Sequence, residues 1–178
     1  MAASVGQAVI KRAEITRTLG NMFVQKGPVT DAANTLVGGD LVKIAAGALV
    51  RIATNEVLLF GQVLDKSHAS TDIPPEAFFG ENHYVIDPRD CILEINIGAA
   101  NGADVQTGTT GKNVTDLVLG TSYEVYVPTT GTYTGYPFLD PTASVVPLFI
   151  WVGRVDGQQD TDANTRVLVK PVPTTIQP

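Results

Sequence analysis

The chain has 178 residues, a net charge of −6 at pH 7, 17% charged residues and 44% hydrophobic residues. This length fits one domain, or one domain with an arm, that buries a substantial core. The acidic balance argues against a nucleic-acid or anionic-membrane partner, because binding phosphate requires a concentrated basic surface. With two His, one Cys and one Trp in the whole chain, reactive side chains are few, and we expect no enzymatic activity.

Residues 1–35 have a mixed hydrophobic pattern that fits neither a helix nor a strand cleanly. We expect them to form an extended N-terminal arm, of which residues 1 to about 28 engage neighbouring subunits through basic and apolar side chains. Within this segment the alternating run Ile15-Thr-Arg-Thr-Leu19 predicts a single strand. That strand can add to the sheet edge of a partner, or it can be the first strand of its own domain.

Residues 36–178 are expected to form one all-β domain. Strands are predicted at 40–45, 47–53, 56–64, 84–97, 114–119 and 121–127, and turn-forming residues separate them. Long loops are expected at 66–83, which contains the pair Pro74-Pro75, and at 128–147, which contains four prolines. The fold class is therefore an antiparallel β-sandwich or a small, β-tulip-like barrel with an extended N-terminal arm.

The last part of the chain predicts a closing hairpin. Residues 145–155 and 165–169 are rich in strand-forming side chains and flank a polar loop. Phe149, Trp151 and Gly153 share one face of the first strand, while the other face is also apolar. We expect one face to meet the domain core and the other a neighbouring molecule.

Motifs for metal, cofactor or nucleophile chemistry are weak. His68 and His83 lack the spacing of a metal site, and residues 156–164 lack the order of ligands of an EF-hand. Residues 108–112 do not match a phosphate-binding loop, and Cys91 fits a buried strand residue. We therefore expect no cofactor and no metal.

Several segments resemble the capsid decoration proteins of tailed bacteriophages, also called cement or head-stabilising proteins. They are Gly39-Asp-Leu-Val-Lys-Ile44, Ala48-Leu-Val-Arg-Ile52, Leu59-Phe-Gly-Gln-Val63, Val152-Gly-Arg-Val-Asp-Gly157 and Asn164-Thr-Arg-Val-Leu-Val-Lys170. The resemblance covers residues 36–65 and 120–171. Proteins of this kind are small and all-β, bind the expanded head at quasi-symmetry axes, often form trimers and sometimes dimers, and bridge capsomers with an N-terminal arm.

The resemblance implies a structural virion protein that binds the outside of the capsid and stabilises contacts between major capsid protein subunits. Its partners would be the major capsid protein and further copies of itself, with a trimer favoured over a dimer, and no nucleic acid or membrane. Without a signal peptide or a membrane-spanning run, the chain is expected to assemble onto the virion in the host cytoplasm. The candidate contact residues are Lys11, Arg12, Ile15, Arg17, Leu19, Phe78, Phe79 and Trp151.

Two other classes of function remain open at this point. The first is a β-sandwich ligand-binding or adhesive module of a virion or cell surface, which would bind glycans through exposed aromatic side chains. Its candidates are Tyr123, Tyr126, Tyr133, Tyr136 and Trp151. The second is a hydrolase, which requires a pocket that joins His68 or His83 to a carboxylate.

Overall fold

The structure is a computed structural model that describes residues 8, 10–18, 25–31, 36–63, 81–98, 112–142 and 146–177. Over these ranges the protein is all-β, as the sequence predicted, and it contains no α-helix. Two 3-10 turns, η1 (Val114–Asp116) and η2 (Pro173–Thr175), interrupt the strands. None of the helices in the described part of the chain has the length and apolar character needed to cross a membrane.

Six strands form one sheet, and five of these close into a barrel. The strands are β1 (Glu14–Thr18), β7 (Cys91–Ile97), β8 (Ser122–Tyr126), β9 (Phe138–Asp140), β10 (Phe149–Arg154) and β11 (Arg166–Pro171). Their order is β1-β7-β11-β10-β8-β9, and a further pairing of β7 with β9 closes the barrel. That closing pair is parallel, whereas the other pairs are antiparallel.

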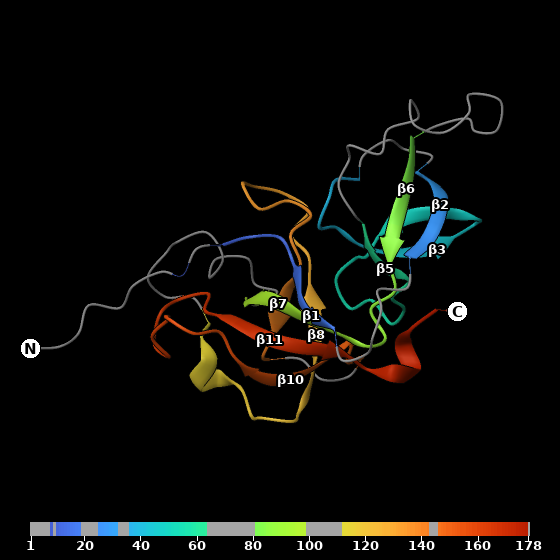
Figure 1. Ribbon diagram of the computed structural model, residues 1–178. Coiled ribbons are helices and arrows are strands. Elements are labelled where there is room, and N and C mark those ends of the chain that lie inside the picture. Colours follow the sequence, from blue (N-terminus) through green and yellow to red (C-terminus); the bar gives the residue numbers. More distant parts are fainter. Residues whose placement is uncertain are drawn as a thin grey trace, which may run out of the picture.

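The remaining five strands form a second sheet in the order β2-β6-β5-β3-β4. They are β2 (Gln25–Asp31), β3 (Leu41–Ala45), β4 (Ala48–Arg51), β5 (Gly61–Val63) and β6 (Glu81–Ile86). In sequence the whole sheet is inserted between β1 and β7 of the barrel. Figure 1 shows it as a separate lobe beside the barrel, with the C-terminus close to it.

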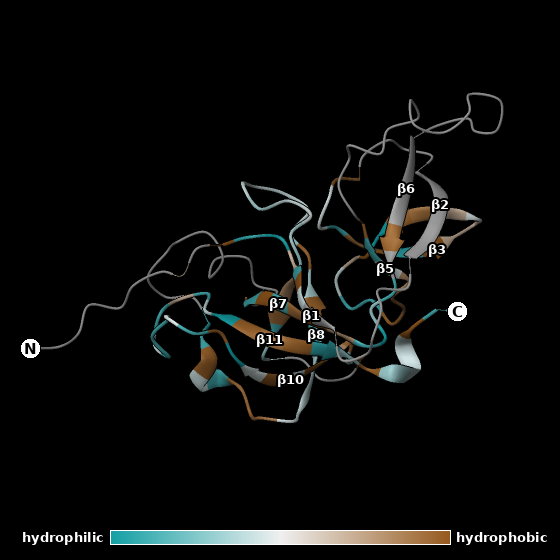
Figure 2. Ribbon diagram, in the orientation of Figure 1, coloured by the Kyte–Doolittle hydropathy of each residue, from teal (hydrophilic) through white to brown (hydrophobic). Residues whose placement is uncertain are grey.

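The described residues form two apolar clusters, and period-two alternation explains which strand side chains enter them. The larger cluster fills the barrel and also includes Leu41, Ile52 and Leu59 from the inserted segment. In β11, Val167 and Val169 are fully buried, whereas Leu168 between them is only half-buried on the outer face. Figure 2 shows the resulting hydrophobic stretches along β7 and β11. A fully buried side chain of this size stabilises the fold by about 1.5–3 kcal/mol. The core of the second sheet is smaller and consists of Leu36, Val42, Leu49, Phe60, Val63 and Val85.

The predicted closing hairpin is confirmed. β10 pairs with β11 in antiparallel fashion from Phe149↔Pro171 to Arg154↔Val167, with a shift in register between Trp151 and Gly153. Trp151 is buried in the barrel core, and its Nε1 donates a hydrogen bond to the carbonyl oxygen of Gly153 at 2.6 Å.

The N-terminal segment differs from the expected arm. Residues 14–18 form β1, which pairs with β7, and residues 25–31 form β2, which pairs with β6. These residues therefore belong to sheets of their own chain, which is the alternative that the alternating run Ile15–Leu19 left open. The physical reason is that Ile15 packs against the barrel core.

The two expected long loops have different outcomes. The segment 128–147 contains a strand, β9, whose three residues are all buried. This strand was not predicted because prolines and glycines flank it and because its partner β7 lies far away in the sequence. Most of the segment 66–83 lies outside the described residues.

Candidate interaction site

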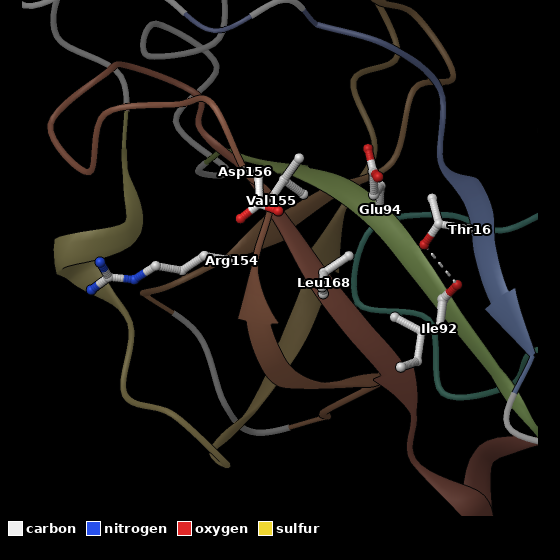
Figure 3. Close-up of a pocket in the computed structure, with 7 residues that line it drawn as sticks. All are labelled: Thr16, Ile92, Glu94, Arg154, Val155, Asp156 and Leu168. Carbon is white, nitrogen blue, oxygen red and sulfur yellow. Dashed lines mark hydrogen bonds between the residues drawn. The ribbon is translucent and has the colours of Figure 1, made fainter.

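A cavity of about 280 Å³ lies on the outer face of the barrel, over strands β1, β7, β10 and β11 (Figure 3). Alternation along the strands directs Ile92 and Leu168 to this face, since their neighbours Leu93 and Val169 fill the core. At the edge, the Thr16 hydroxyl donates to the carbonyl oxygen of Ile92 at 3.4 Å. We call this cavity the outer-face groove; it is lined by Thr16, Ile92, Glu94, Arg154, Val155, Asp156 and Leu168.

The polar end of the outer-face groove is acidic. The side chains of Glu94 and Asp156 lie beyond the apolar pair Ile92 and Leu168, and the Arg154 side chain extends away from Glu94 (Figure 3). Arg154 is engaged elsewhere, because its Nη1 lies 2.5 Å from Oδ2 of Asp160. The groove therefore combines apolar surface with two carboxylates, neither of which is paired with Arg154.

A smaller cavity of about 170 Å³ adjoins the groove and shares Arg154, Val155 and Asp156 with it. Arg166, with 5% of its side chain exposed, also lines this second cavity. Its Nε donates to Oε2 of Glu94 at 3.0 Å and its Nη1 to Oδ1 of Asn96 at 3.3 Å. Among the described residues its Nη2 has no hydrogen-bond partner, and it lies 3.9 Å from Oε2 of Glu14.

A second exposed feature of the barrel is an apolar turn between η1 and β8. Val118 and Leu119 are 66% and 65% exposed, the highest values among the large hydrophobic residues of the described chain. The turn is held firmly, because the Val118 amide donates to the Tyr123 hydroxyl at 2.6 Å. The Gly120 amide also donates to the carbonyl oxygen of Trp151 at 3.0 Å. Exposed apolar groups on a fixed turn are typical of protein contact surfaces.

The contact residues predicted near the N-terminus have mixed outcomes. Lys11 is exposed, whereas the Arg12 guanidinium pairs with the buried carboxylate of Asp40 and is not free to meet a partner. Ile15 packs against the barrel core, and Arg17 pairs through its backbone with Ile92.

The remaining predicted contact residues fall into two groups. Trp151 is a core residue of the barrel, as one of the two expected placements had it. Leu19, Phe78 and Phe79 lie outside the described residues.

The aromatic side chains proposed for glycan binding are not exposed. Tyr123 and Trp151 are buried, and the other three, Tyr126, Tyr133 and Tyr136, are partly buried. Tyr136 packs edge-to-face with Tyr133 and carries the Arg12 guanidinium over its ring, 4.5 Å from the ring centroid. The expectation of an exposed aromatic platform is therefore wrong for these five residues.

Of the side chains considered above for metal or nucleophile chemistry, those that the structure describes have structural roles. No group of three or more His, Cys, Asp or Glu side chains in the described ranges could hold a metal ion. Cys91 is buried, and burial raises the pKa of its thiol to about 11, with smaller contributions from the charges of Asp87 and Asp90. In the loop before β11, Asp162 accepts a hydrogen bond from the Gln159 amide at 3.2 Å, as expected of a turn. His68 lies outside the described residues, as does the side chain of His83.

Sequence reasoning missed the residues of the outer-face groove. The available signal was the apolar character of both faces of the final hairpin, which predicted an exposed apolar face without locating it. Glu94 and Arg166 lie on strands that are far apart in the sequence. The pairing of β7 with β11, which places Leu168 opposite Glu94, cannot be predicted from the local hydrophobic pattern.

Comparison with known proteins gave no match, whether to protein-family models, to curated proteins or to solved structures.

Proposed function

We propose that this chain is a structural virion protein that binds the outside of a bacteriophage capsid and stabilises contacts between major capsid protein subunits. The observation that carries the proposal is the fixed, exposed apolar turn at Val118 and Leu119. An apolar contact that is already ordered loses little conformational entropy when a protein partner covers it. Such a turn supports binding to a protein partner, a function that requires no catalytic activity.

The choice of a capsid as the partner is supported by the resemblance of five segments to capsid decoration proteins. These segments fall on or beside β3, β4, β5, β10 and β11, so they belong to both lobes. A protein that resists pressure on a capsid must transmit force through its fold, and a closed barrel has few free strand edges to open. Binding as an oligomer, with a trimer favoured, would add avidity to modest individual contacts.

The glycan-binding alternative depended on exposure of five aromatic side chains, and it is disfavoured because two of them are buried and the other three are partly buried. An adhesive module binds sugars by stacking them on open aromatic faces, and Tyr136 already offers its ring to Arg12. The contact with a capsid requires no such face.

The test is co-sedimentation of the purified chain with expanded heads of the phage that encodes it, prepared without this protein. We expect the wild-type chain to bind and to raise the temperature at which the heads release DNA. The double variant Val118→Ser with Leu119→Ser should bind at least about tenfold more weakly, since each exposed apolar contact contributes on the order of 1 kcal/mol.

The matched control is Val57→Ser, which changes another exposed apolar residue, 46% accessible, in the segment between β4 and β5. It should bind like the wild type. Absence of binding to heads, together with clear hits on a glycan array, would replace the proposal with the adhesive alternative.

A further inference from the structure

We infer that the outer-face groove receives a lysine or arginine side chain from an extended segment of a protein partner. The inference rests on the proposed function, because it names the chemistry of the protein that the barrel contacts. It goes further in assigning one class of side chain to one cavity. Two features of the groove carry it.

The first feature is the apolar floor. Ile92 and Leu168 are each half-buried on the outer face and lie next to each other in the cavity (Figure 3). Lysine and arginine bury their methylene stems on such surfaces while their charged ends stay in a polar environment. A cavity of about 280 Å³ is large enough for one long side chain.

The second feature is the excess of negative charge at the polar end. Glu94 and Asp156 line the groove, and Glu14 lies beside them near Arg166. Glu94 and Glu14 share one guanidinium, that of Arg166, and Arg154 is paired with Asp160. Asp156 has no hydrogen-bond or ion-pair partner among the described residues. A cation supplied by a partner would compensate this charge.

The same features argue against other occupants. A phosphate or carboxylate ligand would meet Glu94 and Asp156, and an uncharged apolar side chain would leave Asp156 without a partner. A basic residue within a peptide satisfies the apolar floor and the carboxylates together.

The test is a titration of the full chain followed by ¹H–¹⁵N correlation spectra. The probes are N-acetyl-lysine amide and N-acetyl-arginine amide, with N-acetyl-norleucine amide as the uncharged analogue and N-acetyl-glutamate amide as the anion. Concentrations reach about 20 mM, because one side chain gives a millimolar dissociation constant at best. We expect the basic probes to shift the amides of Ile92, Asp156 and Leu168, at least threefold more tightly than norleucine, and the anion to shift none of them.

The variant Asp156→Asn should weaken binding of the basic probes at least threefold and leave the norleucine probe unchanged. The exposed Asp90, which lines neither cavity, gives the matched control Asp90→Asn, and this variant should bind like the wild type. Equal shifts with norleucine, shifts with glutamate, or no localised shift would overturn the inference. If the probes fail while heads still bind, the groove assignment is wrong and the capsid function stands; if the probes bind and heads do not, the reverse holds.

Discussion

Cys91 shows how the barrel changes the chemistry of a single residue. It begins β7 with its side chain in the core, and its Sγ donates to the carbonyl oxygen of Asp87 at 3.4 Å. Burial disfavours the thiolate and is the largest cause of the raised pKa, and the negative charges of Asp87 and Asp90 act in the same direction. The position therefore suits a small apolar group and not a nucleophile.

We predict that Cys91 resists alkylation and lowers the stability of the fold in alkaline solution. With a pKa of about 11 in place of 9.0, the thiolate fraction at pH 8 is about a hundredfold lower than for an ordinary cysteine. Iodoacetamide should label the folded chain correspondingly slowly and the urea-unfolded chain rapidly. Because the folded pKa is the higher one, the contribution of the thiol is fully present below pH 9 and is lost as the pH rises toward 11.

The control for this prediction is Cys91→Ala, in which the other titrating groups remain. The measurement is the free energy of unfolding in urea at several pH values between about 8 and 11. If the wild type and Cys91→Ala lose stability in parallel over this range, the thiol makes no pH-dependent contribution and the prediction is wrong.

At the scale of elements, the barrel closes because β7 has two partners on the same edge. Its first half pairs with β1, from Cys91 to Glu94, and its end pairs with β9 at Asn96 and Ile97. Just beyond this end, the Gly98 amide donates to the carbonyl oxygen of Leu139 at 3.0 Å. Phe138 packs against the same glycine, so closure needs a residue without a side chain there.

We predict that Gly98→Ala destabilises the protein by about 1–3 kcal/mol, the usual cost of overpacking a core. An added Cβ would lie 2.9 Å from Cδ1 of Phe138, whose ring is fully buried and has no room to retreat. The measurement is urea unfolding monitored by Trp151 fluorescence. In the control Gly153→Ala the new Cβ lies 3.4 Å from Cδ1 of Leu168, a flexible atom on the outer face, and we expect a change of under about 0.5 kcal/mol.

The same elements show what the sequence could predict. The β10–β11 hairpin was predictable because its alternation is long and its two strands are neighbours in the chain. β9 was not, because it has three residues and its partners β7 and β8 are fixed by closure of the barrel. β1 was recognised as a strand, but its partner was not, since an alternating run does not say whose sheet edge it joins.

The candidate site was less predictable than the fold for the same reason. The expected contact residues were chosen by local charge and hydrophobicity, and such reasoning cannot foresee that Arg12 pairs with Asp40, 28 residues away. The outer-face groove takes its floor from β7 and β11 and its edge from β1, three strands that lie far apart in sequence. Only the non-local pairing assembles it.

At the scale of the whole molecule, the two lobes are joined by buried polar contacts. Gln62 of β5 accepts a hydrogen bond from the amide of Ile15 in β1 at 3.2 Å and donates to the carbonyl oxygen of Ala13. The C-terminal tail adds a second joint, because the side chain of Gln177 accepts from the Ile44 amide at 2.7 Å and donates to its carbonyl oxygen. The chain thus passes from the barrel to the second sheet and back, and contacts from the β1 segment and from the C-terminal tail hold the second sheet to the barrel.

Asp40 forms a further buried polar contact between the two lobes. Its fully buried carboxylate accepts hydrogen bonds from Arg51, at the end of β4, at 2.6 and 3.0 Å, and from the Val37 amide at 3.0 Å. It also pairs with Arg12, which precedes β1 in the barrel. One carboxylate therefore satisfies a guanidinium from each lobe.

We predict that the wild-type chain unfolds in a single calorimetric transition and that Asp40→Asn lowers the free energy of unfolding by about 3–5 kcal/mol. The substituted amide keeps the shape of the side chain but loses its charge, and its NH₂ group would face guanidinium donors, so Arg12 and Arg51 would lose their common counterion. The matched control Asp156→Asn makes the same chemical change at an exposed position and should cost under about 0.5 kcal/mol. If the wild type melts in two steps, or if both variants melt alike, the lobes are not coupled through Asp40. A second transition that appears only in Asp40→Asn would show that this carboxylate makes the two lobes unfold as one cooperative unit.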